Sequence, residues 1–243
     1  MVSIIIPCYN ASKYICKAID SALKQKVEKE IIIIDDCSTD NTREIVKKYL
    51  ETGSIHIVCN SVNKGVAESR NSGVQMAKGE YIAFLDADDY WEEDKLERQL
   101  EELKKKKGVF CYTGRILVTE NGEKTKKTIS TKEVNTYKTL CMHNDISCSS
   151  VLIERKVALE FPMEHDEVHE DYLTWLRVLR KYGMAYGINE PLLCYRLSKN
   201  GKSRNRLKSA KMTYGVHRYM GDGRSRAFWR TCTHLLKSLK KQM

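Results

Sequence analysis

The sequence predicts an α/β fold in which a mostly parallel central sheet is flanked by helices. Short β-branched runs at 2–6, 31–34, 55–58 and 81–85 alternate with longer segments that have helical spacing, an order of elements typical of parallel sheets. The composition, 42% hydrophobic and 30% charged, excludes disordered, collagenous and coiled-coil proteins. In addition, acidic residues directly follow two of the predicted strands. A chain of 243 residues forms one large domain or two small ones.

Boundary signals indicate where the first two helices lie. An apolar stripe over 14–23 predicts the first helix, with Ser12 placed to cap it. Asp40 is placed to cap the second helix, which Gly53 is expected to end. Each helix therefore connects two successive strands and packs on a face of the sheet.

Two more helices follow in the same half of the chain. The third is predicted over about 65–77 and ends at Gly79. The fourth begins with the acids of 92–94 and ends with the lysines of 104–107. Acidic residues at the start and basic residues at the end suit the helix dipole.

The pattern changes in the second half. The segment 110–119, the turn Asn121-Gly122 and the polar stretch 123–134 predict a hairpin or a covering loop. A strand at about 148–153 and a helix at about 170–181 follow. We therefore expect a domain over 1–198, with a nucleotide-binding half (1–107) and an acceptor half (108–198).

The positive charge of the chain is concentrated at its end. Residues 199–243 contain 13 Lys and Arg but one acid, Asp222, a net charge of +12, whereas residues 1–198 carry −2. One or two basic helices are predicted over 205–243, interrupted at 221–223. Such an extension indicates an anionic partner: nucleic acid, an anionic lipid surface or a phosphorylated substrate.

Several classes of protein are not expected. No apolar run approaches the roughly 18 residues of a membrane-spanning helix, and the start has no signal-peptide pattern, so we expect a cytoplasmic protein. The nine cysteines are an odd number without a Cys-x-x-Cys pair. This pattern predicts neither a disulfide framework nor a zinc site.

The residues that follow the strands are the candidate ligand-binding residues, because open parallel sheets bind ligands beyond the carboxyl ends of their strands. They lie at 7–10, 35–40 and 86–89. Asp86 and Asp88, two apart in extended chain, are expected to point to the same side. Carboxylates without nearby His or Cys suit Mg²⁺ or Mn²⁺, ions that bind diphosphate oxygens.

Strand-end acids also have a simpler explanation as helix caps and turn formers. We favour this explanation for Asp40. It is weaker for Asp86 and Asp88, because one cap needs one acid and three fall within 86–89.

Five segments resemble, in order, the motifs of the family 2 glycosyltransferases. They are Ile-Ile-Ile-Pro-Cys-Tyr-Asn (4–10), Ile-Ile-Asp-Asp-Cys-Ser-Thr-Asp (33–40), Asn-Lys-Gly-Val-Ala-Glu-Ser-Arg-Asn (63–71), Gly-Glu-Tyr-Ile-Ala-Phe-Leu-Asp-Ala-Asp-Asp (79–89), and Glu-Asp-Tyr-Leu-Thr-Trp-Leu-Arg (170–177) with Pro-Leu-Leu-Cys-Tyr-Arg (191–196). The resemblance implies a GT-A fold and transfer of a sugar, with inversion, from a nucleotide diphosphate sugar to a saccharide or lipid-linked saccharide acceptor.

The resemblance also implies roles for residues of the donor site. Pro7, Tyr9 and one or both of Asp35 and Asp36 would bind the nucleotide, and the sequence does not choose between the two acids. A carboxylate can accept the imide hydrogen of uracil. The resemblance favours uridine as the base, with guanosine and thymidine as alternatives, so a UDP-sugar is the expected donor.

Further residues of the site are assigned in the same way. Arg70 would lie near the nucleotide or hold an acid of the site. Asp86 would face the ribose and contribute to the metal shell, and Asp88 would bind Mn²⁺ or Mg²⁺. Asp89 extends this cluster or caps the next turn.

The resemblance implies that Asp171, which matches the catalytic acidic residue of the family's Glu-Asp motif, is the catalytic base; the acceptor hydroxyl must lose a proton as it attacks. Glu170 and Asp171 also suit the first turn of a helix, and both explanations can hold. His165 and His169 are close enough in sequence to contact the acceptor.

The chain lacks the Gln-x-x-Arg-Trp element typical of the processive synthases that the family resembles, since Phe228 rather than Arg precedes Trp229. We therefore expect one sugar per acceptor. The alternatives are a nucleotidyltransferase, which would need a Gly-rich loop after the first strand, and a nucleic-acid-binding module acting through 199–243. We expect no nucleic acid partner. Instead, Leu235, Leu236 and Leu239 among lysines are expected to rest on the inner face of an anionic membrane.

Overall fold

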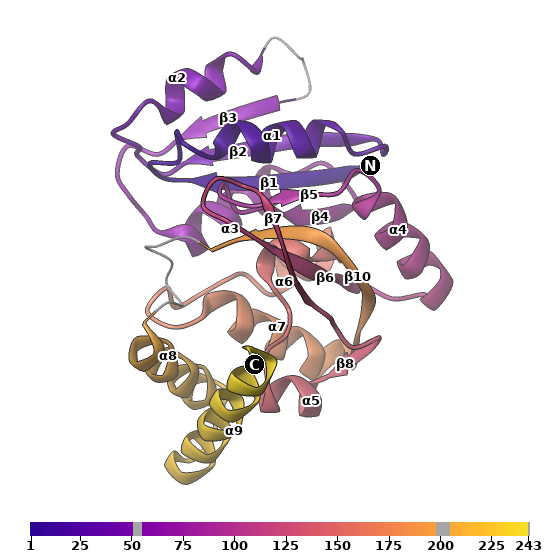
Figure 1. Ribbon diagram of the computed structural model, residues 1–243, viewed down its shortest axis with the longest axis vertical. Coiled ribbons are helices and arrows are strands. Elements are labelled where there is room, and N and C mark those ends of the chain that lie inside the picture. Colours follow the sequence, from indigo (N-terminus) through magenta and orange to yellow (C-terminus); the bar gives the residue numbers. More distant parts are fainter. Residues whose placement is uncertain (51–54, 198–204, 243) are drawn as a thin grey trace.

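The computed structural model describes residues 1–50, 55–197 and 205–242, with side chains described as far as Ser238. In these residues ten strands form one sheet (Figure 1). The strands are β1 (Val2–Cys8), β2 (Lys29–Asp35), β3 (Ile55–Cys59), β4 (Tyr81–Phe84), β5 (Tyr90–Trp91), β6 (Phe110–Val118), β7 (Lys124–Ile129), β8 (Val134–Thr136), β9 (Leu152–Glu154) and β10 (Met184–Arg196).

Helices pack on this sheet and extend beyond its edge (Figure 1). They are α1 (Ile15–Leu23), α2 (Thr42–Lys47), α3 (Val66–Met76), α4 (Lys95–Lys106), α5 (Tyr137–Met142), the 3₁₀ helix η2 (Cys148–Ser150), α6 (Arg155–Glu160), α7 (Glu170–Tyr182), α8 (Arg206–Tyr219) and α9 (Arg224–Gln242).

The sheet has a parallel half and a mixed half. Its order is β3-β2-β1-β4-β9-β6-β10-β5, and the first four strands are all parallel. β9 runs antiparallel to both β4 and β6, whereas β10 is parallel to β6. The predicted α/β class and mostly parallel sheet are confirmed.

Alternating residues of β1 show why helices cover both faces. Ile5 packs in one core with residues of α3, α6 and α7, while Ile4 and Ile6 pack in a second core with residues of α1, α2 and α4. Successive side chains of a strand point to opposite faces. A β-branched run buried along its whole length therefore needs helices on both sides, as the sequence predicts.

Two predicted helix boundaries are wrong in detail. α1 begins at Ile15 with Tyr14 at the N-cap position and no side-chain cap, so the predicted cap, Ser12, lies two residues too early. The backbone N–H of Ser12 instead donates to Asp40 Oδ2 (3.2 Å). Asp40 also accepts from the backbone N–H of Thr42 (3.0 Å), although the N-cap position of α2 is Asn41. Asp40 thus ties two loops together, and Gly53, the expected end of this helix, lies outside the described residues.

The second half contains one confirmed and one corrected element. β6 and β7 form the predicted hairpin, with Gly122 at φ +83° in its turn. The predicted strand over 148–153 is wrong in extent. Residues 148–150 form η2 and the strand starts at Leu152, because two buried serines at this point make a turn rather than extended chain.

The basic extension forms α8 and α9, and the predicted interruption at 221–223 is confirmed. Val216 of α8 and Met220, directly after this helix, belong to the same core as Leu173 and Leu176 of α7. α9 packs against α5 and α8, so the two helices form the end of the molecule opposite α2 and β3 (Figure 1). No helix in the described part of the chain is long and apolar enough to cross a bilayer.

Candidate active site

The candidate site lies where the direction of strand addition reverses. From β1 the chain adds β2 and β3 on one side, and then β4 on the other side of β1. Such a switch point is the usual ligand site of an open α/β sheet. The acids at the ends of β2 and β4 are not on neighbouring strands, because β1 lies between the two.

The two acids after β2 are buried and hold neighbouring loops. Asp36 accepts hydrogen bonds from Asn60 Nδ2 (2.8 Å) and from the backbone N–H groups of Lys64 (2.9 Å) and Gly65 (2.8 Å). Asp35 accepts from Arg43 Nε and from the backbone N–H of Ser38. Asp36 therefore shapes the loop that leads into α3, and Asp35 the loop that leads into α2.

The end of β1 presents an aromatic ring beside these acids. Pro7 is paired with Ile34 within the sheet and is buried. Tyr9, two residues further, is 52% exposed. An exposed ring at a switch point can stack on a nucleotide base.

The acids after β4 form a tight turn rather than the extended chain we expected. The backbone N–H of Asp89 donates to the carbonyl of Asp86 (3.0 Å). Asp89 is buried and accepts a hydrogen bond from the backbone N–H of Arg196 (2.9 Å). Asp89 therefore attaches this turn to the end of β10, and it caps no helix.

Arg196 is a residue to which sequence reasoning assigned no role. Its side chain donates to the carbonyls of Asp88 (2.6 Å) and Glu120 (2.7 Å), and its guanidinium lies over the Tyr14 ring. It joins the β4 turn to the β6–β7 hairpin. Its signal in the sequence is its place at the end of the motif segment 191–196.

Among the acids of this turn, Asp88 has a raised pKa of the kind that a bound cation would counteract. Desolvation by burial and the neighbouring Asp86 raise the pKa of Asp88 to about 6. A cation would offset both effects. No three His, Cys, Asp or Glu side chains gather into a metal-binding group within 1–50, 55–197 and 205–242, so protein ligands alone would not complete the shell of a bound cation.

Arg70 joins the donor side of the site to α7. Its Nη2 donates to Asp86 Oδ1 (2.6 Å) and its Nη1 to Glu170 Oε1 (2.9 Å). Arg70 is 4% exposed. Burial alone would lower its pKa, but the charges of Asp86 and Glu170 raise it. Arg70 is thus no solvated arginine of a helix face, and the structure realises the second of its two expected roles, holding an acid.

Asp171 follows Glu170 in the first turn of α7. Its Oδ1 accepts a hydrogen bond from the backbone N–H of Tyr172 (2.7 Å). Desolvation by burial and the adjacent Glu170 charge raise the pKa of Asp171 to about 7, against the opposing effect of Arg70. A carboxylate with a pKa near neutral is suited to accept a proton at physiological pH.

The loop before α7 is held between α3 and α8. Asp166 Oδ1 accepts a hydrogen bond from the backbone N–H of Ala67 (3.2 Å), and a Cβ on Gly65 (φ +91°) would lie 1.9 Å from Asp166 Oδ2. On the other side, the His165 ring stacks on the Tyr219 ring, with 3.8 Å between the ring centroids. His169 Nε2 lies 3.1 Å from Ser209 Oγ. The rings of both histidines therefore contact α8.

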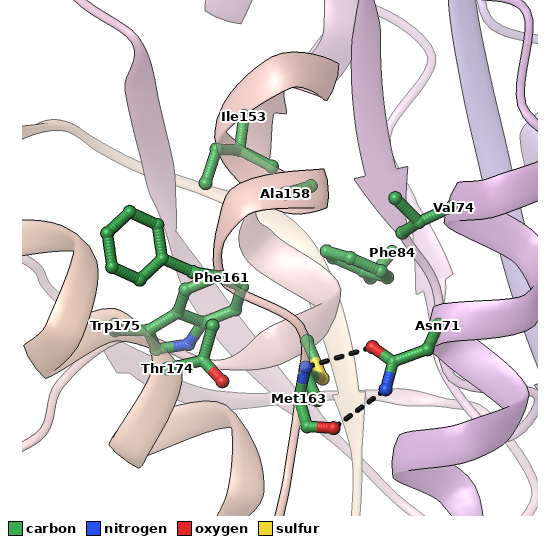
Figure 2. A pocket seen from close by; sticks show the side chains of 9 residues that line it. All are labelled: Asn71, Val74, Phe84, Ile153, Ala158, Phe161, Met163, Thr174 and Trp175. Carbon is green, nitrogen blue, oxygen red and sulfur yellow. Dashed lines mark hydrogen bonds between the residues drawn. The ribbon is translucent and has the colours of Figure 1, made fainter.

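Behind this loop lies a small pocket at the junction of α3, α6 and α7 (Figure 2). Asn71 spans it by exchanging two hydrogen bonds with the backbone of Met163 (2.7 and 2.9 Å). The other lining side chains are mostly apolar, among them Phe84, Phe161 and Trp175. This pocket belongs to the packing that positions α7.

We expect Arg70→Gln to lower the free energy of unfolding by about 3–5 kcal/mol, because it leaves the buried carboxylate of Glu170 and the partly buried carboxylate of Asp86 without their cation. Urea unfolding measures this loss. Arg177→Gln is the matched control, since Arg177 of α7 pairs with Glu164 at the surface, where such pairs contribute about 1 kcal/mol or less. Equal losses in the two variants would contradict the buried bridge.

Comparisons with known proteins identify the family. The model of the family described as "Glycosyl transferase family 2" matches residues 3–158. The chain is 41% identical over 220 residues to the "Putative teichuronic acid biosynthesis glycosyltransferase TuaG" of Bacillus subtilis, covering 90% of this chain and 87% of that one. It is 35% identical over 221 residues to the Escherichia coli "UDP-Glc:alpha-D-GlcNAc-diphosphoundecaprenol beta-1,3-glucosyltransferase WfgD", covering 89% and 85%.

Solved structures share the fold at low sequence identity. TarS 1–349 of S. aureus, in complex with UDP-GlcNAc, aligns with a TM-score of 0.73 at 18% identity, over 93% of this chain and 69% of that one. The mannosyltransferase PcManGT of Pyrobaculum calidifontis, in complex with GDP-Man and Mn²⁺, aligns with a TM-score of 0.71 at 17% identity, over 96% and 68%. The GT-A fold is thereby confirmed, and with the family match it follows that the chain is a glycosyltransferase that belongs to glycosyl transferase family 2.

Proposed function

We propose that the enzyme transfers one sugar from a UDP-sugar to a hydroxyl of a lipid-linked saccharide in the synthesis of a cell-surface polysaccharide. One observation carries the proposal: Arg70 holds Asp86 and Glu170 together, which joins the Asp86–Asp89 turn to the start of α7 at the switch point of the sheet. This arrangement supports a site in which the proposed donor-binding acids and the proposed base act together.

Asp171 is the proposed base. It takes the proton from the acceptor hydroxyl while that oxygen attacks the anomeric carbon from the face opposite the leaving diphosphate. A single displacement of this kind inverts the configuration of the sugar. The pKa of about 7 supports the assignment, because the carboxylate is then a better proton acceptor than an ordinary aspartate.

A divalent cation fits the turn after β4. Mg²⁺ usually takes one or two carboxylates from the protein and completes its shell with phosphate oxygens and water. Asp88, with Asp86 contributing, would hold Mn²⁺ or Mg²⁺ in this manner. The ion would stabilise the negative charge that develops on the departing diphosphate.

The remaining donor contacts are proposed for the edge formed by β1 and β2. Tyr9 has the exposure that stacking on the base requires. Pro7, Asp35 and Asp36 shape the same edge, where the two acids are already engaged by Arg43 and by backbone amides. The proposed role of the two acids is therefore to hold the loops against which the nucleotide lies. A carboxylate oxygen of either acid that keeps an unused lone pair would make any contact with the base.

The relatives support the donor and acceptor classes. The name of WfgD specifies UDP-glucose and a diphosphoundecaprenol-linked sugar, and that of TuaG specifies teichuronic acid biosynthesis. Family membership favours sugar transfer over the nucleotidyltransferase and over a module that binds nucleic acid. We keep the division into a catalytic domain (1–198) and a basic extension (199–243) as a proposal, with α8 packed in the core of the catalytic domain.

A thermal-shift screen of UDP-, GDP- and dTDP-sugars with and without Mn²⁺ tests the proposed function. We expect the largest rise in melting temperature with a UDP-sugar, and a smaller rise when Mn²⁺ is omitted, because only a bound ligand stabilises the folded state. A larger rise with a GDP- or dTDP-sugar would show that this sugar, and not a UDP-sugar, is the donor. Equal rises in melting temperature with and without Mn²⁺ would contradict the proposed metal in the donor site.

A further inference from the structure

We propose that the outer face of α9, defined here as Phe228, Trp229 and Leu236, docks on an anionic lipid bilayer. This inference rests on the proposed function, since a lipid-linked acceptor requires the enzyme to work at a membrane surface. This face differs from the set of leucines expected to contact the membrane from the sequence, of which it includes Leu236. Leu235 is half-buried, Leu236 is exposed, and the side chain of Leu239 lies outside those described.

The outer face is apolar and lies opposite the side by which α9 is packed. Phe228, Trp229 and Leu236 are 65%, 57% and 62% exposed. Ala227 and Thr231, on the other side of the helix, are buried where α9 meets α5 and α8. Helical periodicity brings positions 228, 229 and 236 to one side of the helix, away from 227 and 231. α9 therefore has a second apolar face beyond the one that the fold uses.

Basic residues border this face, and the sequence of α9 contains no acid. Arg224, Arg226 and Lys237 are exposed. The one acid of 199–243 is Asp222, which is 6% exposed and paired with Arg230 (2.6 Å). A helix with aromatic residues bordered by Lys and Arg has the pattern of one that lies in the headgroup region of a membrane.

The charges favour a membrane over a second copy of the chain. In a two-fold dimer the same surface meets itself. Two outer faces would then bring Arg226 and Lys237 of both copies together with no carboxylate between them, and like charges oppose such an interface. An anionic bilayer supplies the missing negative charge and an apolar region for the rings.

Tryptophan fluorescence tests the proposal directly. The chain has three tryptophans, of which Trp91 and Trp175 are buried and Trp229 is exposed. We expect vesicles of equimolar phosphatidylglycerol and phosphatidylcholine to shift the emission to the blue, whereas pure phosphatidylcholine vesicles leave it nearly unchanged. Salt at 1 M should weaken binding, because the screening length falls to about 3 Å.

Paired variants separate the apolar from the electrostatic contribution. Phe228→Ser with Leu236→Ser keeps the Trp229 reporter and should weaken vesicle binding roughly tenfold or more. Arg226→Gln with Lys237→Gln should weaken it about fivefold per charge. Leu50→Ser is the control, an exposed leucine just after α2 at the opposite end of the molecule, and should bind as the unmodified protein does.

Four results would overturn the proposal: no blue shift with anionic vesicles, equal binding to neutral ones, a blue shift caused by raising the protein concentration alone, or the same shift with a single-stranded oligonucleotide. The third would indicate a dimer and the fourth a nucleic acid partner. All variants should keep the thermal shift with UDP-sugar. Loss of that shift in every protein would refute the proposed function and leave the vesicle result standing.

Discussion

Asp171→Asn is expected to lower the rate of sugar transfer by about 100- to 10,000-fold, the usual contribution of a general base. The amide keeps the shape of the side chain and can still accept the hydrogen bond from the N–H of Tyr172. It cannot take the proton of the acceptor hydroxyl. Donor affinity should therefore be unchanged, and initial rates with a saturating donor measure the loss.

Glu167→Gln provides the matched control for this variant. Glu167 is an exposed carboxylate in the loop just before α7, where it accepts a hydrogen bond from Tyr219. We expect the Glu167→Gln variant to transfer sugar at close to the rate of the unmodified enzyme. Near-normal transfer by Asp171→Asn would assign the base elsewhere, and Glu170 would be the next residue to test.

The same assignment predicts the pH dependence of transfer. Because the pKa of Asp171 is raised to about 7, the active carboxylate form is lost as the pH falls through 7. Below that value the rate should drop about tenfold per pH unit. The Asp171→Asn variant should lack this step. A profile that is flat between pH 5 and 8 in the unmodified enzyme would contradict the assignment.

Asp88→Ala is expected to remove the part of UDP affinity that depends on Mn²⁺. The reason is that Asp88 is the proposed protein ligand and phosphate oxygens complete the shell. The loss should exceed the roughly 10- to 100-fold that follows removal of a group outside the metal shell. Calorimetric titration of UDP with and without Mn²⁺ gives the two affinities whose ratio is compared.

Asp94→Ala controls for the loss of a negative charge in the same region. Asp94 precedes α4, is half-exposed and pairs with Arg98 at the surface. Its removal should leave the ratio of the two affinities unchanged. If Asp88→Ala bound UDP in saturating Mn²⁺ as tightly as the unmodified protein, the metal would have to lie elsewhere.

The sequence determined those features that depend on neighbouring residues. The β-branched runs predicted β1 to β4, because a strand buried on both faces needs apolar residues throughout its length. The break between α8 and α9 was readable from Gly221 and Gly223. The motifs indicated the family, which the comparison over 3–158 confirmed.

Local patterns were misleading where contacts with distant residues arrange the chain. Ser12 was expected to cap α1, but the helix begins three residues later, and the backbone N–H of Ser12 is held by Asp40, 28 residues away. Asp86 and Asp88 would point to one side in extended chain, yet the chain turns there because Asp89 is anchored to Arg196, 107 residues away.

Only the tertiary structure decided how the site is assembled. Arg70 could have been a solvated arginine until α7 brought Glu170 to it from 100 residues away. The order of the sheet decided that β1 separates the acids of β2 from those of β4. Packing likewise decided that one face of α9 is buried and another, also apolar, is exposed. Periodicity and composition record what each segment can do alone, whereas a buried charge or an unpartnered face depends on which distant segment the fold places beside it.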